Sequence, residues 1–502
     1  MFRAFLVLSS GSVIGKFIGF LREILMAALF GTGIYVAAYR VAQTAVLMPI
    51  EFFLTNSLEA GFVPLYVRYA KEDPKKARTF LTVTVMLFLL LAGIIFLFLY
   101  LGSSWWVKIL APGMDDTSKA LTASMLHVMT LAVPLYILGM LMAYLEMAHG
   151  RYLTASLRST IQSVGLISGS LLAIYFKNPL FLAWGFVFAY LFYLLWLLSS
   201  LYNLGLLHFK VTLSRHLAIE TFRGFWNSVR PVLIVPLLIQ GNIAIEKIVA
   251  SLIGSTAIAA VDYAKFVTET GVILIAAPLG MVGLSALSGL DPDLVRQKVG
   301  QIANIVLIFM IPISLFIACN NVDIVHILYA RGVFDQESVE VTSKILLGFS
   351  IGMWAQVLSY YFIRVLNSQL RNTEVLIYMI ISTLIDIGIK LILYKNLGPF
   401  VLGLGVSVNS VILCIFTINA LRLNKELYST FLWMALGVIL YILIHIGVSC
   451  ISILSWHLSR YTRLFIIFGL FSLYWIIYVF TVPKLKAHIY HVFVDKLHNL
   501  FH

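Results

Sequence analysis

Charged side chains interrupt the apolar stretches of this 502-residue sequence, mostly in its first, second and eighth apolar runs. A charge at mid-membrane costs at least about 2.5–3.5 kcal/mol, so such residues usually face a polar cavity and bind something. Arg contacts phosphate oxygens bidentately and Lys acts as a point charge. A site that contains both acidic and basic side chains is therefore suited to a ligand with an anionic headgroup and polar sugars. The candidate binding residues are Lys16, Arg22, Glu23, Arg40, Glu51, Glu59 and Lys265.

Two of these charged groups have a structural alternative. Arg22 and Glu23 are adjacent and could form a structural ion pair near the end of the first run. Asp386 and Lys390, in the eleventh run, are spaced i, i+4 and could neutralise each other on one helix face. The sequence leaves both alternatives open.

The composition predicts that these residues lie in a polytopic membrane protein. Apolar residues make up 61% of the chain and charged residues 11%, against roughly 45–50% and about 25% in soluble domains. A soluble enzyme and a disordered scaffold are both excluded. At about 20 residues per span, the sequence predicts an all-α fold of about 14 transmembrane helices. The runs are 5–30, 34–63, 79–102, 120–147, 157–176, 179–206, 231–253, 256–289, 300–320, 341–364, 375–394, 399–421, 429–453 and 464–483.

The distribution of basic residues predicts the orientation. Most loop Lys and Arg residues fall on one side of the predicted membrane, including the segment 64–78. By the positive-inside rule, both termini are expected in the cytoplasm. The net charge of +13 is then explained mostly by the basic residues of the loops on the cytoplasmic side. A nucleic-acid partner is not needed to explain it.

An internal repeat predicts two six-helix halves. Ala111-Pro112-Gly113 resembles Ala330-Arg331-Gly332, and Arg151 and Arg371 end corresponding runs about 220 residues apart. Both halves would enter from the same side, which predicts a pseudo-two-fold axis along the membrane normal and a substrate site between rocking halves. The expected organisation is an N-terminal half at 1–206, an amphipathic cytoplasmic linker at 207–230, a C-terminal half at 231–421, and two added helices with a tail at 422–502.

Absent motifs narrow the function to transport without catalysis. No Walker A sequence occurs, which argues against an ATP-driven pump. Cys319, Cys414 and Cys450 form no C-x-x-C pair. A membrane-embedded glycosyltransferase would need a long outer loop with catalytic carboxylates, and the longest such loop, near 321–340, is short. We therefore expect a transporter and not an enzyme.

Four stretches resemble the MurJ/MviN family of lipid II flippases, in the superfamily that includes MATE multidrug exporters. They are GFLREILMAALFGTG at 19–33, AGFVPLYVRYAKED at 60–73, YAKFVTETGVILIAAPLGMVGLSALS at 263–288 and ILYARGVFDQESVEVTSKILLGFSIG at 327–352. The resemblance implies transport of a polyprenyl-pyrophosphate-linked saccharide, similar to lipid II, from the inner to the outer leaflet by alternating access. It also implies the bacterial cytoplasmic membrane as the location, membrane lipids as surroundings and a monomer as the working unit.

The resemblance also bears on individual residues. Arg22 matches the family's first-span Arg, and Lys16 stands where another Arg is usual. The second run departs from the family pattern, because Ala37 stands where an Asp is usual. The eighth run departs from it as well, because Lys265-Phe266 replaces an Asp-Arg pair. Another undecaprenyl-linked oligosaccharide is therefore an alternative substrate, and a MATE-like exporter of small molecules is an alternative function.

No organic cofactor is expected, but the resemblance raises sodium as a coupling ion. Some members of this family bind sodium between spans seven, eleven and twelve. In this sequence the oxygen ligands there would be Asp386, Ser382, Asn242, Glu246 and Ser407. Lys390 competes with this prediction, because it lies one helical turn from Asp386.

Overall fold

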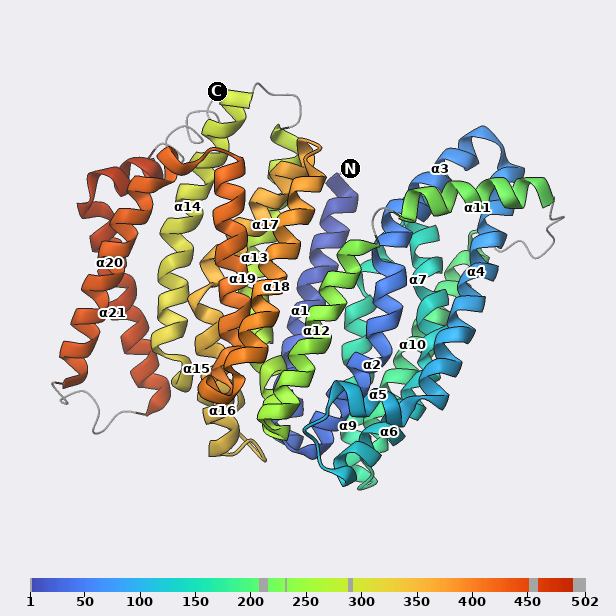
Figure 1. Ribbon diagram of the computed structural model, residues 1–502, viewed down its shortest axis with the longest axis horizontal. Helices are drawn as coiled ribbons and strands as arrows, with labels where there is room; N and C mark the ends of the chain where they lie inside the picture. The colour runs from blue at the N-terminus through green and yellow to red at the C-terminus, as the bar shows by residue number, and fades with distance from the viewer. Residues whose placement is uncertain (1, 207–214, 231–232, 288–291, 451–458, 491–502) are drawn as a thin grey trace. The chain divides into compact units, whose positions relative to one another are not determined.

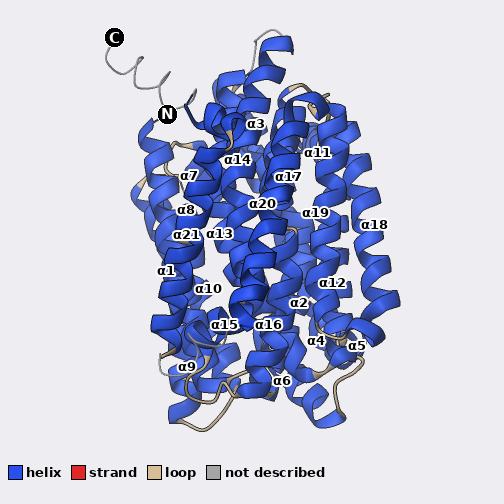
Figure 2. Ribbon diagram, turned by 90° about the vertical axis from the view of Figure 1, so that its left-hand side faces the viewer, coloured by secondary structure: helices blue, strands red, loops and turns tan. Residues whose placement is uncertain are grey.

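The structure is a computed structural model that describes residues 2–206, 215–230, 233–287, 292–450 and 459–490. Helices and short loops make up these residues, and no strand occurs among them (Figure 2). The predicted linker and C-terminal tail therefore lie partly outside the described residues, at 207–214 and 491–502.

Within the described residues, each of the fourteen predicted apolar runs overlaps a long helix or a bent pair of helices. These elements are α1 (Phe2–Phe30), α2 (Ile34–Asn56), α4 (Pro74–Leu101), the pair α6 (Asp116–Thr130) and α7 (Ala132–Ala148), α9 (Arg158–Tyr175), α10 (Leu180–Asn203), α12 (Ile234–Ile253), α13 (Ser255–Leu287), α14 (Pro292–Cys319), the pair α16 (Gln336–Ile351) and α17 (Met353–Ser368), α18 (Asn372–Leu397), α19 (Phe400–Ala420), α20 (Asn424–Cys450) and α21 (Arg460–Thr481). Short helices connect them: η1 (Ser57–Phe62), α3 (Val63–Glu72), α5 (Ser103–Leu110), α8 (Leu153–Ser156), α11 (Arg215–Val229) and α15 (Asn321–Tyr329).

Eight of the described helices are long and apolar enough to cross a membrane, or ten if each bent pair is one span. The pairs α6–α7 and α16–α17 bend by 43° and 47°. The helix α1 carries Lys16, Arg22 and Glu23 within its apolar sequence. The all-helical architecture is confirmed, and the total of fourteen spans stays a prediction.

The chain forms two compact units, residues 1–259 with 331–335 and residues 260–330 with 336–502. In the first unit, α1 packs against α9, and α2 packs against α6 and α12 (Figure 1). In the second unit, α19 packs against α16, α17 and α18, and α14 packs against α20. The division of the sequence at 207–230 stays a prediction.

The order of elements repeats along the chain. The series α4, α5, α6–α7, α9, α10 recurs as α14, α15, α16–α17, α18, α19. Pro74 and Pro292 begin α4 and α14, and the two bends lie at Leu131 and Gly352. The repeat inferred from sequence landmarks therefore extends to the positions of helix starts and helix bends.

Ser407 of α19 holds the bend between α16 and α17. Its hydroxyl accepts a hydrogen bond from Gly352 N at 2.8 Å and donates to Gly348 O at 2.5 Å. A Cβ on Gly352 would lie 2.5 Å from Ser407 Cα. A side chain at position 352 would therefore push α19 away from the backbone groups that the bend exposes.

The helix of the predicted linker, α11, has two apolar faces. Phe225 and Val229 are buried, and α11 packs on α4 and η1, lying across the end of α4 (Figure 1). Ile219, Phe222 and Trp226, spaced for the other face, are 40–47% exposed. This pattern is typical of a helix that lies in the membrane interface.

Candidate functional site

Two arginines share one buried carboxylate in the first unit. Glu23 of α1 is 1% exposed. Arg22 contacts its Oε1 through Nη2 at 2.5 Å and Nε at 3.1 Å, and Arg40 of α2 contacts Oε2 through Nη2. The third donor of Arg22, Nη1, reaches Ser163 Oγ of α9 at 3.3 Å. The cluster Arg22–Glu23–Arg40 therefore carries a formal charge of +1 inside a helical bundle.

Small residues let α1 approach α9 closely enough for the Arg22–Ser163 contact. A Cβ on Gly15 would lie 2.5 Å from Ser159 Oγ of α9, and one on Gly11 would overlap the side chain of Ser156 in α8, the short helix just before α9. Small residues at helix interfaces are typical of membrane proteins, where they allow backbones to pack at short distance.

A second charged cluster joins α2, α7 and α9. Tyr136 donates its hydroxyl hydrogen to Glu51 Oε1 and accepts a hydrogen bond from Arg158 Nη1. Arg158 Nη1 lies 3.6 Å from the same Glu51 oxygen, and its guanidinium lies 5.5 Å from the centre of the Tyr136 ring. Formal charges balance in the cluster Glu51–Tyr136–Arg158.

The other predicted binding residues are less completely placed. Lys16 of α1 and Lys265 of α13 are both half-buried. Lys16 belongs to the first unit and Lys265 to the second. Glu59 lies in η1, and its side chain is outside the described residues. The structure thus brings together Arg22, Glu23 and Arg40, and separately places Glu51 with an arginine.

Sequence reasoning missed several polar residues of these clusters. Arg158 begins α9 at the edge of the predicted run 157–176, and its side chain turns to Glu51. The signal for Tyr136 was hidden, because tyrosine is common in apolar helices. The hydroxyls of Tyr39 and Tyr190 are buried with no hydrogen-bond partner among the described residues. Such hydroxyls supply donors for a ligand that enters.

The predicted sodium ligands divide between the units. Asn242 and Glu246 of α12 belong to the first unit, and Asp386, Ser382 and Ser407 belong to the second. Lys390 Nζ lies 3.0 Å from Asp386 Oδ2, and both side chains are fully buried. The i, i+4 pairing predicted as an alternative is therefore present. Among the described residues no group of three or more His, Cys, Asp or Glu side chains could hold a metal ion.

Ser382 and Ser407 have other partners in the second unit. Ser382 Oγ donates to Met379 O at 3.2 Å, and Ser407 holds the α16–α17 bend. A Cβ on Gly405 would overlap Asp386 Oδ1, so the absence of a side chain there makes room for the carboxylate. The sodium site stays a prediction.

A loop from later in the chain packs on the end of α1. Val333 N donates to Ala28 O at 2.9 Å. Gly332 has a φ of +60°, and a Cβ there would overlap Ala28 O. The segment 331–335 accordingly belongs to the first unit. This segment lies within the stretch 327–352, one of those that carry the family resemblance.

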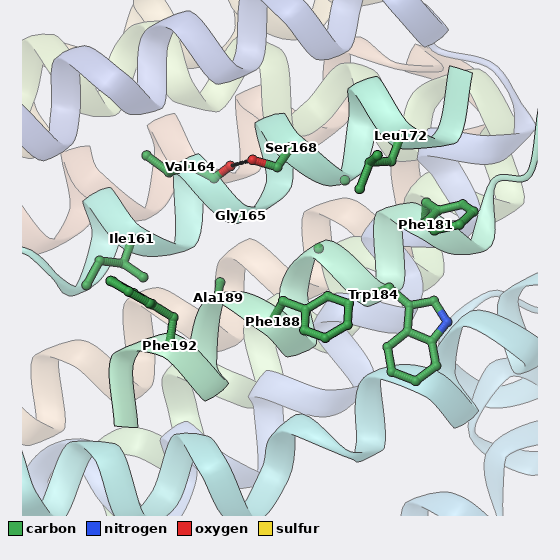
Figure 3. A pocket seen from close by; sticks show the side chains of 12 residues that line it. Ile161, Val164, Gly165, Ser168, Leu172, Phe181, Trp184, Phe188, Ala189 and Phe192 are labelled. Atoms are coloured by element: carbon green, nitrogen blue, oxygen red, sulfur yellow. Dashed lines mark hydrogen bonds between the residues drawn. The ribbon is translucent and has the colours of Figure 1, made fainter. Parts of the chain in front are cut away.

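An apolar groove lies between α9 and α10. Figure 3 shows Phe181, Trp184, Phe188 and Phe192 along one wall. The hydroxyl of Ser168 donates to the Val164 carbonyl of its own helix. Such a lining suits hydrocarbon and offers nothing to a charged headgroup.

Comparison with known proteins identifies the family. A family model described as "Lipid II flippase MurJ" matches residues 26–475. A "Probable lipid II flippase MurJ" of Rhizobium tropici is 28% identical over 391 residues, covering 71% of this chain and 68% of the relative.

Two solved structures show the same fold. One described as "Lipid II flippase MurJ, inward closed conformation" has a TM-score of 0.81 at 18% identity, covering 97% of this chain and all of that chain. An inward-facing MATE multidrug resistance transporter has a TM-score of 0.66 at 14% identity, covering 84% of this chain and 98% of that chain. The all-α polytopic membrane fold is thereby confirmed. Since the family model spans most of the sequence, this chain is a member of the MurJ family of lipid II flippases and an integral membrane transporter, not an enzyme.

Proposed function

We propose that this protein moves lipid II, a polyprenyl-pyrophosphate-linked saccharide, from the inner to the outer leaflet of the bacterial cytoplasmic membrane. Family membership supports the substrate class. The structural observation that supports the proposal is the cluster Arg22–Glu23–Arg40, a net cationic group in an apolar helical bundle. Guanidinium groups bind diphosphate oxygens with charge-assisted hydrogen bonds.

Arg22 is the cluster residue that a ligand reaches first. Its side chain is 15% exposed, against 7% for Arg40 and 2% for Glu23. An incoming diphosphate would compete with Glu23 for the Arg22 guanidinium. Lys16 and Lys265 would add positive charge, and Glu51 and Glu59 would accept hydrogen bonds from the sugar hydroxyls.

The proposed cycle is alternating access by a monomer with both termini in the cytoplasm. The repeat of helices and bends supports two rocking halves, since transporters of this kind hold the substrate at the repeat interface. A MATE-like exporter of small cations is the less favoured alternative, because the cluster is cationic and would repel such a substrate.

The test is flipping of lipid II in vesicles that contain the purified protein. Arg22→Gln and Arg40→Gln are each expected to lower the rate by about tenfold or more, since a charge-assisted hydrogen bond is worth roughly 1.5–3 kcal/mol. Arg68→Gln is the matched control, because Arg68 is 71% exposed and forms a surface ion pair with Glu72 of the same helix. Equal rates in all three variants would refute the role of the cluster. Flipping of another undecaprenyl-linked saccharide, but not of lipid II, would support the alternative substrate.

Sodium coupling is a separate part of the proposal, with Asp386, Ser382, Asn242, Glu246 and Ser407 as ligands. Sodium would have to displace Lys390 from Asp386, because their side chains already form an ion pair. If sodium binds, it should raise the thermal stability of the purified protein above that in potassium, and Asp386→Ala should remove the difference. Equal stability in both salts would exclude this site.

A further inference from the structure

A polar pocket lies at the N-terminal ends of α14 and α20, far along the chain from the arginine cluster. Its empty volume is about 950 Å³, and Arg296, Gln297, Gln301, Asn304, Glu426 and His488 line it. All of these residues belong to the second unit. None of them takes part in the proposed transport site.

Two oxygen acceptors in this pocket have no donor among the described residues. Asn304 is 2% exposed, and its Nδ2 donates to Glu426 O at 3.3 Å while its Oδ1 has no partner. Arg296 contacts Glu426 Oε1 at 2.7 Å, but Oε2 of the same carboxylate is buried with no partner. A buried acceptor without a hydrogen bond destabilises the folded protein, so binding of a ligand that donates a hydrogen bond is favoured in this pocket.

The same face of α14 continues into an apolar groove. Ile308 and Pro312 follow Asn304 at helical spacing, and these two residues line a groove of about 1070 Å³ with Phe471 and Trp475 of α21. Residues three or four apart share a helix face. The polar pocket and the groove therefore follow one another along a single stripe of α14.

The chain after α21 also links the two spaces. His488 lines the polar pocket and Ile489 lines the groove. In the groove, Trp475 Nε1 is a buried donor with no acceptor among the described residues, and Trp475 belongs to the same apolar cluster as Ile308. A ligand in the groove could therefore be held by an acceptor group for this indole N–H.

We propose that this stripe of α14, with α20 and α21, binds a membrane phospholipid whose headgroup carries a primary ammonium. The ammonium donates to Asn304 Oδ1 and Glu426 Oε2, an ester carbonyl accepts from Trp475 Nε1, and the acyl chains fill the groove. A bare metal ion would leave the apolar groove unfilled. A choline headgroup has no N–H to donate.

The experiment measures thermal stabilisation of the purified full-length protein by lipids that share acyl chains and differ in the headgroup. Ethanolamine, N-methyl-, N,N-dimethylethanolamine and choline lipids are compared. The apparent affinity is expected to fall along this series, by about tenfold or more from first to last, because donors to charged and buried acceptors are lost. Equal affinity for the ethanolamine and choline lipids overturns the proposal, whatever the behaviour of any variant.

Variants locate the effect in this pocket. Glu426→Gln and Asn304→Leu should each abolish most of the ethanolamine preference. Glu374→Gln is the matched control, because Glu374 forms a comparable Arg–Glu pair with Arg371 at the start of α18 at 2.6 Å, and it should keep the preference. An unchanged preference in folded Glu426→Gln and Asn304→Leu overturns the assignment of the headgroup to this pocket.

Soluble probes distinguish a lipid from a free cation. Phosphoethanolamine and sodium chloride, each added without lipid, should give little stabilisation because neither fills the groove. Stabilisation by either probe equal to that by the ethanolamine lipid overturns the lipid as occupant. The measurement involves no transport, so its failure would leave the proposed flippase function intact.

Discussion

At the scale of residues, Glu23 determines how two arginines can share one small space. Arg22 and Arg40 each contact one oxygen of the Glu23 carboxylate, and the three side chains are mostly buried. Two guanidinium groups at this distance would repel each other strongly in a medium of low dielectric constant. The carboxylate therefore keeps the cationic cluster assembled while no anion is bound.

Glu23→Gln should destabilise the protein more than Arg22→Gln does. The first change removes the carboxylate that both buried cations contact, which costs about 3–5 kcal/mol. The second leaves the Glu23–Arg40 pair intact. The comparison is made by thermal unfolding in detergent, with Glu72→Gln as a surface control because Glu72 is 43% exposed. An Arg22→Gln variant that unfolds at a lower temperature than Glu23→Gln would contradict this order.

The sequence predicted part of this chemistry and missed part of it. Arg22, Glu23 and Arg40 were found because a charge in an apolar run is conspicuous. Arg158 and Asn304 were missed for opposite reasons: Arg158 begins its helix and reads as a loop residue, while an uncharged amide does not interrupt an apolar run. Which charges meet across helices depends on packing, which a single sequence does not encode locally.

At the scale of elements, the apolar runs predicted each long helix but not the bends within them. Pro134 explains the α6–α7 break, because it cannot donate to the Thr130 carbonyl four residues earlier, whereas no proline lies in α16 or α17. The second bend depends instead on a contact with Ser407, more than fifty residues later in the chain. A bend stabilised by such a distant side chain cannot be recognised from the residues around it.

Ser407→Ala should destabilise the second unit by about 1–3 kcal/mol, because it leaves the buried Gly352 N–H without an acceptor. Ser410→Ala is the control, since the Ser410 hydroxyl bonds only the Val406 carbonyl of its own helix at 2.8 Å. Thermal unfolding of both variants provides the measurement. Equal losses would show that the serine does not hold the bend.

The attachment of α11 to α4 should weaken in acid. Lys76 donates to Glu220 at 2.8 Å, and this hydrogen bond lowers the pKa of the exposed Glu220 carboxyl below its usual value of 4.5. The pair therefore stabilises the folded state above pH 4.5 and loses this effect as the pH falls through the lowered pKa. Hydrogen exchange of residues 215–229 should rise over that range, whereas Glu220→Gln should remove the step.

At the scale of the whole molecule, the internal repeat allows equivalent positions of α4 and α14 to be compared. Met86, Leu90, Ile94 and Phe98 are 52–65% exposed on one stripe of α4. The corresponding positions of α14, counted from Pro74 and Pro292, begin with Asn304 and continue with Ile308. In α14 this stripe is covered by α20 and α21, which lie outside the repeat.

A chain that ends at Leu423 should fail to accumulate as a folded protein. Without α20, the buried Asn304 Nδ2 would lose its acceptor, Glu426 O, at a cost of roughly 1–3 kcal/mol. Adding Asn304→Leu to the truncated chain should restore part of the folded yield, measured by size-exclusion chromatography. No improvement on adding this change would show that the loss has another origin.

The contrast between Met86 and Asn304 also shows what α20 contributes to the second unit. Glu426 O of α20 accepts a hydrogen bond from Asn304, whereas Met86 at the equivalent position of α4 is exposed. The asparagine therefore suits its position only while α20 is present, so the two added helices are part of the stability of the second unit.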